Sequence, residues 1–343
     1  MNSPQYIQTS LAAAITLGLE PGRFKERVKL TGLNLLLVYD KKCIGKCAYC
    51  GLSNQREAID STGKKNSKTF IRVKWPVYPL ETIIKKTVEN SDAFERICVS
   101  MVTNANALKD SVFIIKKLRE SLSHPISILL TPTLINIKDQ LAELKNAGAD
   151  MAGIAIDAAT EELFEKYRGN GVKGPHKWEK YWEVLKWAVE AFGKYMAGIH
   201  LITGLGETEK EMVETINKAY QIGAKTHLFS FYPEAYSMLE NLDPPEILKY
   251  RKVQIARYLI NEKNCDINKI RFDKEDNISG FDYDTEELVK EGFAFMTSGC
   301  PGSNKNIAAC NRPLANERPS ETFRNYPYIP DENERELIRR QIK

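Results

Sequence analysis

Three cysteines, Cys43, Cys47 and Cys50, lie within eight residues of the chain and closely follow an apolar stretch, Leu35–Tyr39. Thiolates at short fixed spacings are the usual protein ligands of iron–sulfur clusters. A cubane cluster has four irons, so three local thiolates leave one iron open to a cofactor or substrate. The alternative is a zinc site, because Cys-x2-Cys is a common zinc half-site. Zinc would need a fourth Cys or His, and none occurs between Cys50 and Cys98, so we predict a cluster.

Strand and helix patterns alternate along most of the chain, after a polar and irregular stretch over residues 51–76. Short apolar runs predict strands at residues 33–39, 96–102, 126–130, 151–156, 196–203, 226–231, 270–273 and 293–297. Eight parallel strands with helical crossovers describe an α/β fold, the (β/α)8 TIM-type barrel, whose active sites lie at the carboxyl ends of the strands. The cysteine motif follows the first strand, so we expect it at the mouth of the barrel.

Three regions follow from this pattern. Residues 1–28 are expected to form a helical cap, with a helix over residues 5–20 that ends at Pro21-Gly22. Residues 29–298 would form the barrel. Residues 299–343 show no clear strand or long helix, and we expect an irregular tail that folds over the barrel mouth and contributes to a second metal site.

Composition limits the class of protein. Lys and Arg number 49 and Asp and Glu 45, for a net charge of +4 without a long basic block, so no nucleic-acid partner is expected. Apolar runs fall short of the ~18 residues of a membrane helix, so no membrane span is expected. Seven cysteines without an apolar signal segment indicate a reducing compartment, where thiols bind metals. We therefore expect a soluble, cytoplasmic protein.

The C-x3-C-x2-C spacing, with Tyr49 just before the last cysteine, resembles the signature of the radical S-adenosylmethionine (radical SAM) superfamily. The stretch Gly204-Leu205-Gly206-Glu207-Thr208 is similar to its biotin-synthase-like branch. The resemblance implies a radical SAM barrel in which Cys43, Cys47 and Cys50 are catalytic and hold a [4Fe–4S] cluster. S-Adenosylmethionine would chelate the open iron, and its reductive cleavage would give a 5′-deoxyadenosyl radical that removes a hydrogen atom from an unactivated carbon.

The same resemblance assigns contacts with S-adenosylmethionine. The residues so assigned are Tyr49, Ser100, Thr103, Asn104, Asp157, Arg168, Gly204, Leu205 and Gly206. Ser100, Thr103 and Asn104 would bind the methionine amino group, or form an ordinary polar loop. Asp157 can accept hydrogen bonds from ribose hydroxyls or cap the next helix, with Thr160 as the alternative cap. Arg168 would pair with the methionine carboxylate, although a lone arginine is often a solvated helix end, and the glycines would approach the adenine.

Four cysteines remain outside the motif. Cys98 lies inside the second predicted strand, and Cys300 follows the last one, from which it could reach the mouth together with Cys310. Cys265 belongs at the opposite face, and we expect it to be structural. Cys98, Cys300 and Cys310 could hold a second, auxiliary [4Fe–4S] cluster with Ser298 or a sulfide as the fourth ligand. The alternative is three unrelated thiols.

Over almost its full length the chain resembles the subunits of the archaeal two-protein lipoyl synthase. The Cys-Pro-Gly and Cys-Asn-Arg-Pro segments after residue 299 are the specific part. This resemblance implies sulfur insertion into an octanoyl chain on a lipoyl carrier protein, such as the glycine-cleavage H protein. A second radical SAM subunit and an electron donor such as ferredoxin are the other implied partners. Aromatic residues that could line a tunnel for the octanoyl chain are Phe229, Phe231, Tyr232, Tyr236 and Tyr326.

Two other functions stay open at this stage. One is another enzyme of the same branch, such as a methylornithine-synthase-like isomerase or a hydrogenase-cofactor maturase, with one essential cluster and a small-molecule substrate. The other is a zinc-bearing scaffold that keeps the barrel without turnover.

Overall fold

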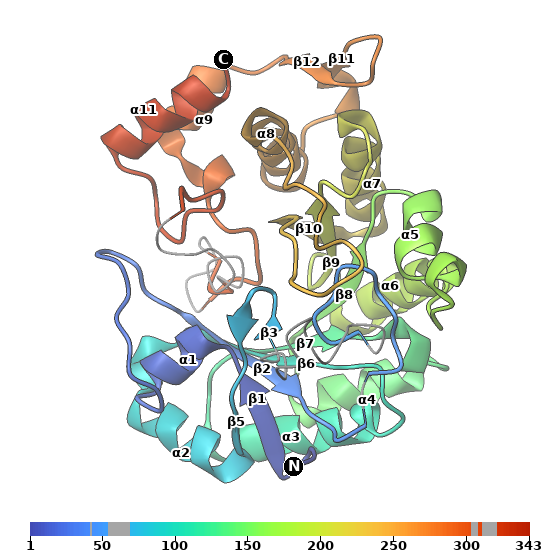
Figure 1. Ribbon diagram of the computed structural model, residues 1–343, viewed down its shortest axis with the longest axis vertical. Coiled ribbons are helices and arrows are strands. Elements are labelled where there is room, and N and C mark those ends of the chain that lie inside the picture. The colour runs from blue at the N-terminus through green and yellow to red at the C-terminus, as the bar shows by residue number, and fades with distance from the viewer. Residues whose placement is uncertain (42, 54–68, 303–307, 311–320) are drawn as a thin grey trace.

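An eight-stranded sheet forms the framework of the computed structural model, which describes residues 1–41, 43–53, 69–302, 308–310 and 321–343 (Figure 1). In spatial order its strands are β10 (Ala224–Ser230), β9 (Ala197–Thr203), β8 (Met151–Asp157), β7 (Ile126–Leu130), β6 (Arg96–Ser100), β2 (Gly32–Leu37), β1 (Tyr6–Thr9) and β5 (Val77–Pro79). From β2 to β10 every neighbouring pair is parallel, whereas β1 is antiparallel to both β2 and β5. The predicted α/β class with a TIM-type parallel sheet is confirmed.

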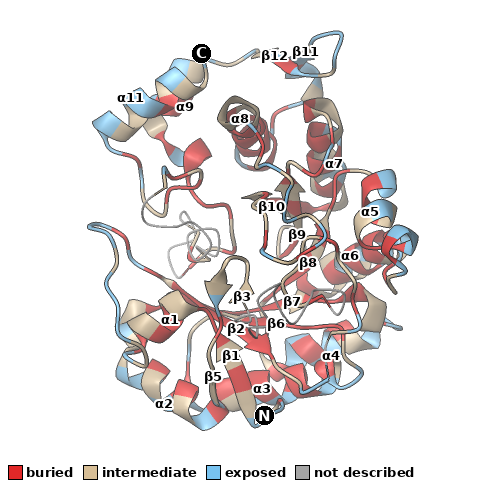
Figure 2. Ribbon diagram, in the orientation of Figure 1, coloured by how far each residue is buried: buried red, intermediate tan, exposed pale blue. Residues whose placement is uncertain are grey.

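Helices connect the parallel strands and cover the outside of the sheet, where Figure 2 shows buried residues on their inner faces. The helices are α1 (Leu11–Thr16), α2 (Leu80–Glu89), α3 (Ala107–Ser121), α4 (Asp139–Ala147), α5 (Glu161–Tyr167), α6 (Trp178–Phe192), α7 (Glu209–Ile222), α8 (Ile247–Lys263), α9 (Thr285–Glu291) and α11 (Glu332–Gln341). Local signals set their starts. Thr208 and Glu211 form a capping box at α7, and the Thr160 hydroxyl accepts the backbone N–H of Leu163 at α5. Thr160 is therefore the cap of α5, which leaves Asp157 to other partners.

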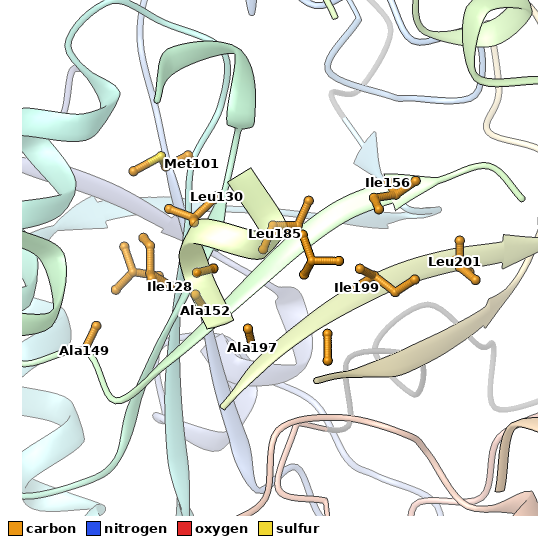
Figure 3. Close-up of a cluster of buried hydrophobic side chains, with 14 of the residues drawn as sticks. Met101, Ile128, Leu130, Ala149, Ala152, Ile156, Leu185, Ala197, Ile199 and Leu201 are labelled. Atoms are coloured by element: carbon orange, nitrogen blue, oxygen red, sulfur yellow. The ribbon is translucent and has the colours of Figure 1, made fainter. Parts of the chain in front are cut away.

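The core lies between the parallel strands and their helices. Figure 3 shows part of it, where Ile128, Ala152 and Ile199 of neighbouring strands pack with Leu185 of α6. All six residues of β2 are buried, as expected of a strand covered on both faces. Full burial of one such aliphatic side chain stabilises the fold by about 1.5–3 kcal/mol.

The last two predicted barrel strands do not join the sheet. Strand β11 (Ile270–Phe272) pairs antiparallel with β12 (Ile278–Phe281) in a separate two-stranded sheet, and Phe293–Phe295 form a 3-10 turn. The chain turns between β11 and β12 because Asp273 accepts backbone N–H groups from two following residues. The strand predicted at 270–273 therefore exists but lies outside the barrel, whereas the one predicted at 293–297 is a turn, because a short apolar run shows neither its pairing partner nor whether it is a strand or a buried turn.

Both ends of the chain also differ from the prediction. The N-terminal helix is limited to α1, because Ser10 caps it and the preceding residues form strand β1. Within the polar stretch 51–76, residues 54–68 lie outside the described residues, and Thr69–Phe70 (β3) and Val73–Lys74 (β4) form a hairpin. The tail contains α11, which begins with a capping box of Asp331 and Glu334. That Asp-x-x-Glu spacing was the signal the sequence prediction missed.

The described part of the tail reaches from β10 to β2, the first and last of the parallel strands in the sheet order. The Ser298 hydroxyl accepts the backbone N–H of Leu228 in β10 at 2.8 Å. On the other side, the Thr31 hydroxyl donates to the Ala309 carbonyl at 2.9 Å. A Cβ on Gly32, the first residue of β2, would lie 3.1 Å from Cys310 Cα. The tail therefore contacts both margins of the parallel strands.

Arg251 of α8 anchors the C-terminal segment from inside the protein. It is fully buried, and its guanidinium donates to the side chains of Gln341 and Gln254 and to the carbonyls of Phe323 and Arg324. Four acceptors thus depend on one buried cation.

We predict that Arg251→Met lowers the free energy of unfolding by about 3 kcal/mol, because it leaves several buried acceptors without a donor. Urea denaturation measures this change. The matched control is Arg340→Met, whose side chain is 72% exposed and which should change stability by less than about 0.5 kcal/mol. Equal stability of the two variants would contradict the anchoring role.

Candidate active site

The three motif cysteines line one cavity of about 210 Å³. The cavity opens at the carboxyl ends of the parallel strands, where Ser100, Thr131 and Asp157 also line it. This is the end of a TIM-type sheet at which active sites lie. The predicted position of the motif is therefore correct.

Backbone hydrogen bonds hold the cysteine loop in place. Ala48 N–H donates to the Tyr167 carbonyl at 2.8 Å, and Ile44 N–H donates to the Thr103 carbonyl at 3.0 Å. The backbone N–H of Thr103 lies 3.4 Å from Cys43 Sγ, and that of Leu52 lies 3.4 Å from Cys50 Sγ. N–H donors directed at cysteine sulfurs stabilise thiolates and tune the clusters that thiolates hold.

A buried ion pair lies beside the loop. Asp157, at the end of β8, has a left-handed backbone (φ 67°) and accepts hydrogen bonds on Oδ2 from Tyr49 Oη at 2.7 Å and Arg168 Nη1 at 2.9 Å. The Arg168 side chain is only 7% exposed and also donates to the carbonyls of Ala155 and Ile156. Tyr49 belongs to the motif, so the ion pair ties the cysteine loop to the end of β8.

A histidine approaches the loop from the other side. Two hydroxyls lie within hydrogen-bond distance of His176 Nδ1, that of Thr133 at 2.7 Å and that of Tyr181 at 3.0 Å. Arg168 Nη2 donates to the same Tyr181 hydroxyl at 3.1 Å. Burial, and next the positive charge of Arg168, lower the pKa of His176 to about 3, so the imidazole is neutral at physiological pH. A Cβ on Gly45 would lie 3.0 Å from His176 Nε2.

Burial also governs the thiols. It raises the pKa of Cys47, an effect that the nearby Arg168 charge opposes. It raises the pKa of Cys50 well above the usual value, with the neighbouring Cys47 adding to the shift. Both thiols are therefore protonated at neutral pH until a metal binds, and metal binding displaces their protons.

The residues present fit a [4Fe–4S] cluster with S-adenosylmethionine. In the described residues no three His, Cys, Asp or Glu side chains converge as around a single metal ion. A cubane does not need three ligands around a single point, because each thiolate ligates a different iron. Arg168 lines the cavity next to Cys47, and its buried Nε has no hydrogen-bond partner among the described residues, so the site holds a cation beside the cysteine loop.

The predicted contacts with S-adenosylmethionine divide into two groups. Tyr49, Ser100, Thr103, Asp157 and Arg168 all line the cavity. The others do not line it.

Each of the others is engaged locally. The side chain of Asn104 accepts the backbone N–H of Asn106 at 3.0 Å, in a turn. The backbone N–H groups of Gly204 and Leu205 donate to the buried carboxylate of Glu207 at 2.8 and 3.0 Å, and Gly206 follows in the same turn. The sequence did not show that the Glu207 carboxylate accepts hydrogen bonds from the backbone N–H groups of Gly204 and Leu205.

Two of the remaining cysteines meet just beneath the cavity. Cys98 Sγ lies 3.7 Å from Ser100 Oγ, two residues along the same face of β6, and Ser100 lines the cavity. Burial raises the pKa of Cys300 to about 11, with nearby Arg96 lowering it and nearby Cys98 raising it, and the thiol also bonds to Ser127. The backbone N–H of Cys310 donates to the Cys300 carbonyl at 3.2 Å. Cys300 therefore lies near Cys98, and the backbone of Cys310 lies next to that of Cys300.

Their position corrects one expectation. The backbone of Cys310 lies against Gly32, at the amino-terminal end of β2, and Arg96 at the same end of β6 donates to the Pro301 carbonyl. Cys300 and Cys310 thus do not reach the mouth, because no eighth strand carries the tail there. Ser298, considered as a fourth ligand, instead accepts a backbone N–H. Cys265 is buried in a separate cluster with α9 and α11, as expected of a structural thiol.

The sequence prediction missed several cavity residues. His176, His200 and Glu234 line the cavity but were not assigned to the site. The chain has only four histidines, and two of these follow or lie in strands β8 and β9. The rarity of histidine, with His200 inside a predicted barrel strand and His176 just before a predicted helix, was the available signal. The expected tunnel aromatics Phe229, Phe231 and Tyr232 do line the cavity, whereas Tyr236 and Tyr326 do not.

No helix in the described ranges is both long and apolar enough to cross a membrane.

A protein-family model and several solved structures are similar to this chain. Residues 39–219 match the model of the Radical SAM superfamily. The [FeFe]-hydrogenase maturase HydG from Carboxydothermus hydrogenoformans has 16% identity, with 72% of this chain and 58% of HydG covered and a TM-score of 0.50. Methylornithine synthase (PylB) has 15% identity, with 67% and 64% covered and a TM-score of 0.47. Coproporphyrinogen III oxidase (HemN) from Escherichia coli has 17% identity, with 62% and 50% covered and a TM-score of 0.40.

This chain spans less than two thirds of each of these three proteins, and at such identities the likeness to HydG shows a shared fold. No curated protein sequence gives a match. The superfamily model itself covers more than half of the chain and includes the cysteine loop, the ion pair and the cavity-lining strands from β6 to β9. The chain is therefore an enzyme of the radical SAM superfamily, which implies a [4Fe–4S] cluster and S-adenosylmethionine as its cofactors.

Proposed function

We propose that this radical SAM enzyme is a sulfurtransferase, a lipoyl synthase component that inserts sulfur into an octanoyl chain on a lipoyl carrier protein. The observation that carries the proposal is the position of two cysteine sets in one barrel. Cys43, Cys47 and Cys50 line the cavity, and Cys98 and Cys300 lie one layer beneath its wall. An isomerase or maturase with one essential cluster has no use for the second set.

The cavity wall suits an aliphatic substrate. Apolar side chains from neighbouring strands make up much of it, including Leu129, Ile202 and Phe229. Burial of an octanoyl chain against this wall would stabilise the bound state by about 0.8 kcal/mol per methylene removed from water. The same apolar wall would keep water away from a carbon radical.

Each set of residues has a separate task in this proposal. Cys43, Cys47 and Cys50 would hold the site cluster, and Arg168 at the cavity wall would bind the methionine carboxylate. When bound, the site cluster and S-adenosylmethionine supply a 5′-deoxyadenosyl radical that takes a hydrogen atom from the octanoyl chain. Cys98, Cys300 and Cys310 would hold the auxiliary [4Fe–4S] cluster, whose sulfide is the sulfur to be inserted.

The proposal also includes partners. The octanoyl chain would be presented on a carrier such as the glycine-cleavage H protein. A second radical SAM lipoyl synthase subunit would perform the other sulfur insertion, and ferredoxin or a similar protein would supply electrons.

Cysteine variants test the two sets separately. We predict that Cys47→Ala abolishes formation of 5′-deoxyadenosine, whereas Cys300→Ala retains it and loses sulfur transfer. Mass spectrometry of an octanoyl-lysine peptide, incubated anaerobically with reductant and S-adenosylmethionine, measures both products. The control Cys265→Ala should keep both activities. Unchanged thiolated product from Cys300→Ala would contradict the sulfur-donor role.

A second prediction concerns the ion pair. Asp157→Ala leaves the buried Arg168 cation unpaired and releases Tyr49, so the free energy of unfolding should fall by about 3–5 kcal/mol. Binding of S-adenosylmethionine should weaken at least tenfold, about 1.4 kcal/mol, since Arg168 loses its orientation. Urea denaturation and anaerobic equilibrium dialysis measure the two effects. The exposed Glu162 provides the control Glu162→Ala, and Asp157→Ala behaving like that control would refute the role of the pair.

A further inference from the structure

The hydrogen bonds of His176 with protein groups involve only one of its two ring nitrogens. The side chain is 2% exposed, and its Nδ1 lies between the hydroxyls of Thr133 and Tyr181. Nε2 makes no hydrogen bond with a described residue and faces the cavity. Nε2 is not among the fully enclosed polar atoms that lack a partner, so a group bound in the cavity can reach it.

The surrounding hydroxyls are compatible with the tautomer of His176 that carries the ring proton on Nε2. Arg168 Nη2 donates to Tyr181 Oη, which leaves the Tyr181 proton free to point at His176 Nδ1. An Nδ1 that accepts a hydroxyl proton places the ring proton on Nε2. In this tautomer the Nε2 proton lies on the cavity side of the ring, and Arg168, which donates to Tyr181, also holds Asp157.

The cysteine loop determines what this donor meets. A Cβ placed on Gly45 would lie 3.0 Å from His176 Nε2, 3.2 Å from Cys43 Sγ and 3.5 Å from Thr103 Oγ1. One point in space is thus close to both the imidazole donor and the Cys43 sulfur. Glycine at position 45 keeps this space free of a side chain.

We propose that His176 donates a hydrogen bond from Nε2 to the iron–sulfur cluster at its Cys43 corner and thereby raises the reduction potential of that cluster. Hydrogen bonds to the sulfurs are one of the ways in which proteins set cluster potentials. The bond strengthens as the cluster gains an electron, so it stabilises the reduced form. His176 is then a positioning and tuning residue, and this role rests on the superfamily cluster rather than on sulfur insertion.

The test is a redox titration of the reconstituted full-length protein, followed by electron paramagnetic resonance without substrate. The signal to follow is the one whose line shape changes when S-adenosylmethionine is added, which separates the site cluster from any second cluster. We expect His176→Phe to shift the midpoint potential of this signal to a more negative value at unchanged iron content. His176→Gln keeps an N–H donor near the position of Nε2 and should restore most of the shift.

The matched control is His124→Phe, because His124 bonds to the Ser91 carbonyl away from the cavity. This variant should keep the wild-type potential. An unchanged midpoint potential in His176→Phe would overturn the proposal. This holds even if the variant bound S-adenosylmethionine more weakly, because the Nε2 donor would then serve the cofactor and not the cluster. If His176→Phe binds too little iron to titrate, the midpoint potential of His176→Gln decides. A His176→Gln potential clearly more negative than that of the wild-type protein would then overturn the proposal.

Discussion

The contact between the Arg168 guanidinium and the Asp157 carboxylate is the interaction on which the site depends. Both side chains are largely removed from water, so each charge requires the other. Asp157 also accepts the Tyr49 hydroxyl, and Arg168 donates to Tyr181, which lies on α6. The end of β8, the cysteine loop and α6 therefore share one buried network. A loop with little regular structure of its own can then present three sulfurs in a defined arrangement.

The barrel organises its cysteines in layers. Side chains two residues apart on a strand lie on the same face, so Cys98 lies directly below Ser100, and Ser127 lies below Leu129. Ser100 and Leu129 line the cavity, and Cys300 bonds to Ser127. The tail brings Cys300 and Cys310 to this lower layer from outside the parallel sheet. Two thiol sets from distant parts of the sequence thus lie at successive levels of one interior.

The sequence predicted the parallel core and the position of the cysteine loop well. Apolar runs such as Ile126–Leu130, flanked by helical patterns, are typical of parallel strands that are buried on both faces. The edge of the sheet that β1 and β5 form was predicted poorly, because β1 is only four residues long and its pairing with β2 and β5 depends on tertiary contacts. His176 was missed for a related reason, because the role proposed for it depends on Thr133 and Tyr181, which are far from Gly45 in the sequence.

Iron and sulfide analysis of the anaerobically reconstituted protein tests the central claim most directly, since it counts the clusters that the two cysteine sets are proposed to hold. The account predicts about eight irons per chain, and about four after Cys98, Cys300 and Cys310 are all replaced by alanine, because each cubane holds four. About four irons in the unaltered protein, unchanged by that replacement, would contradict it.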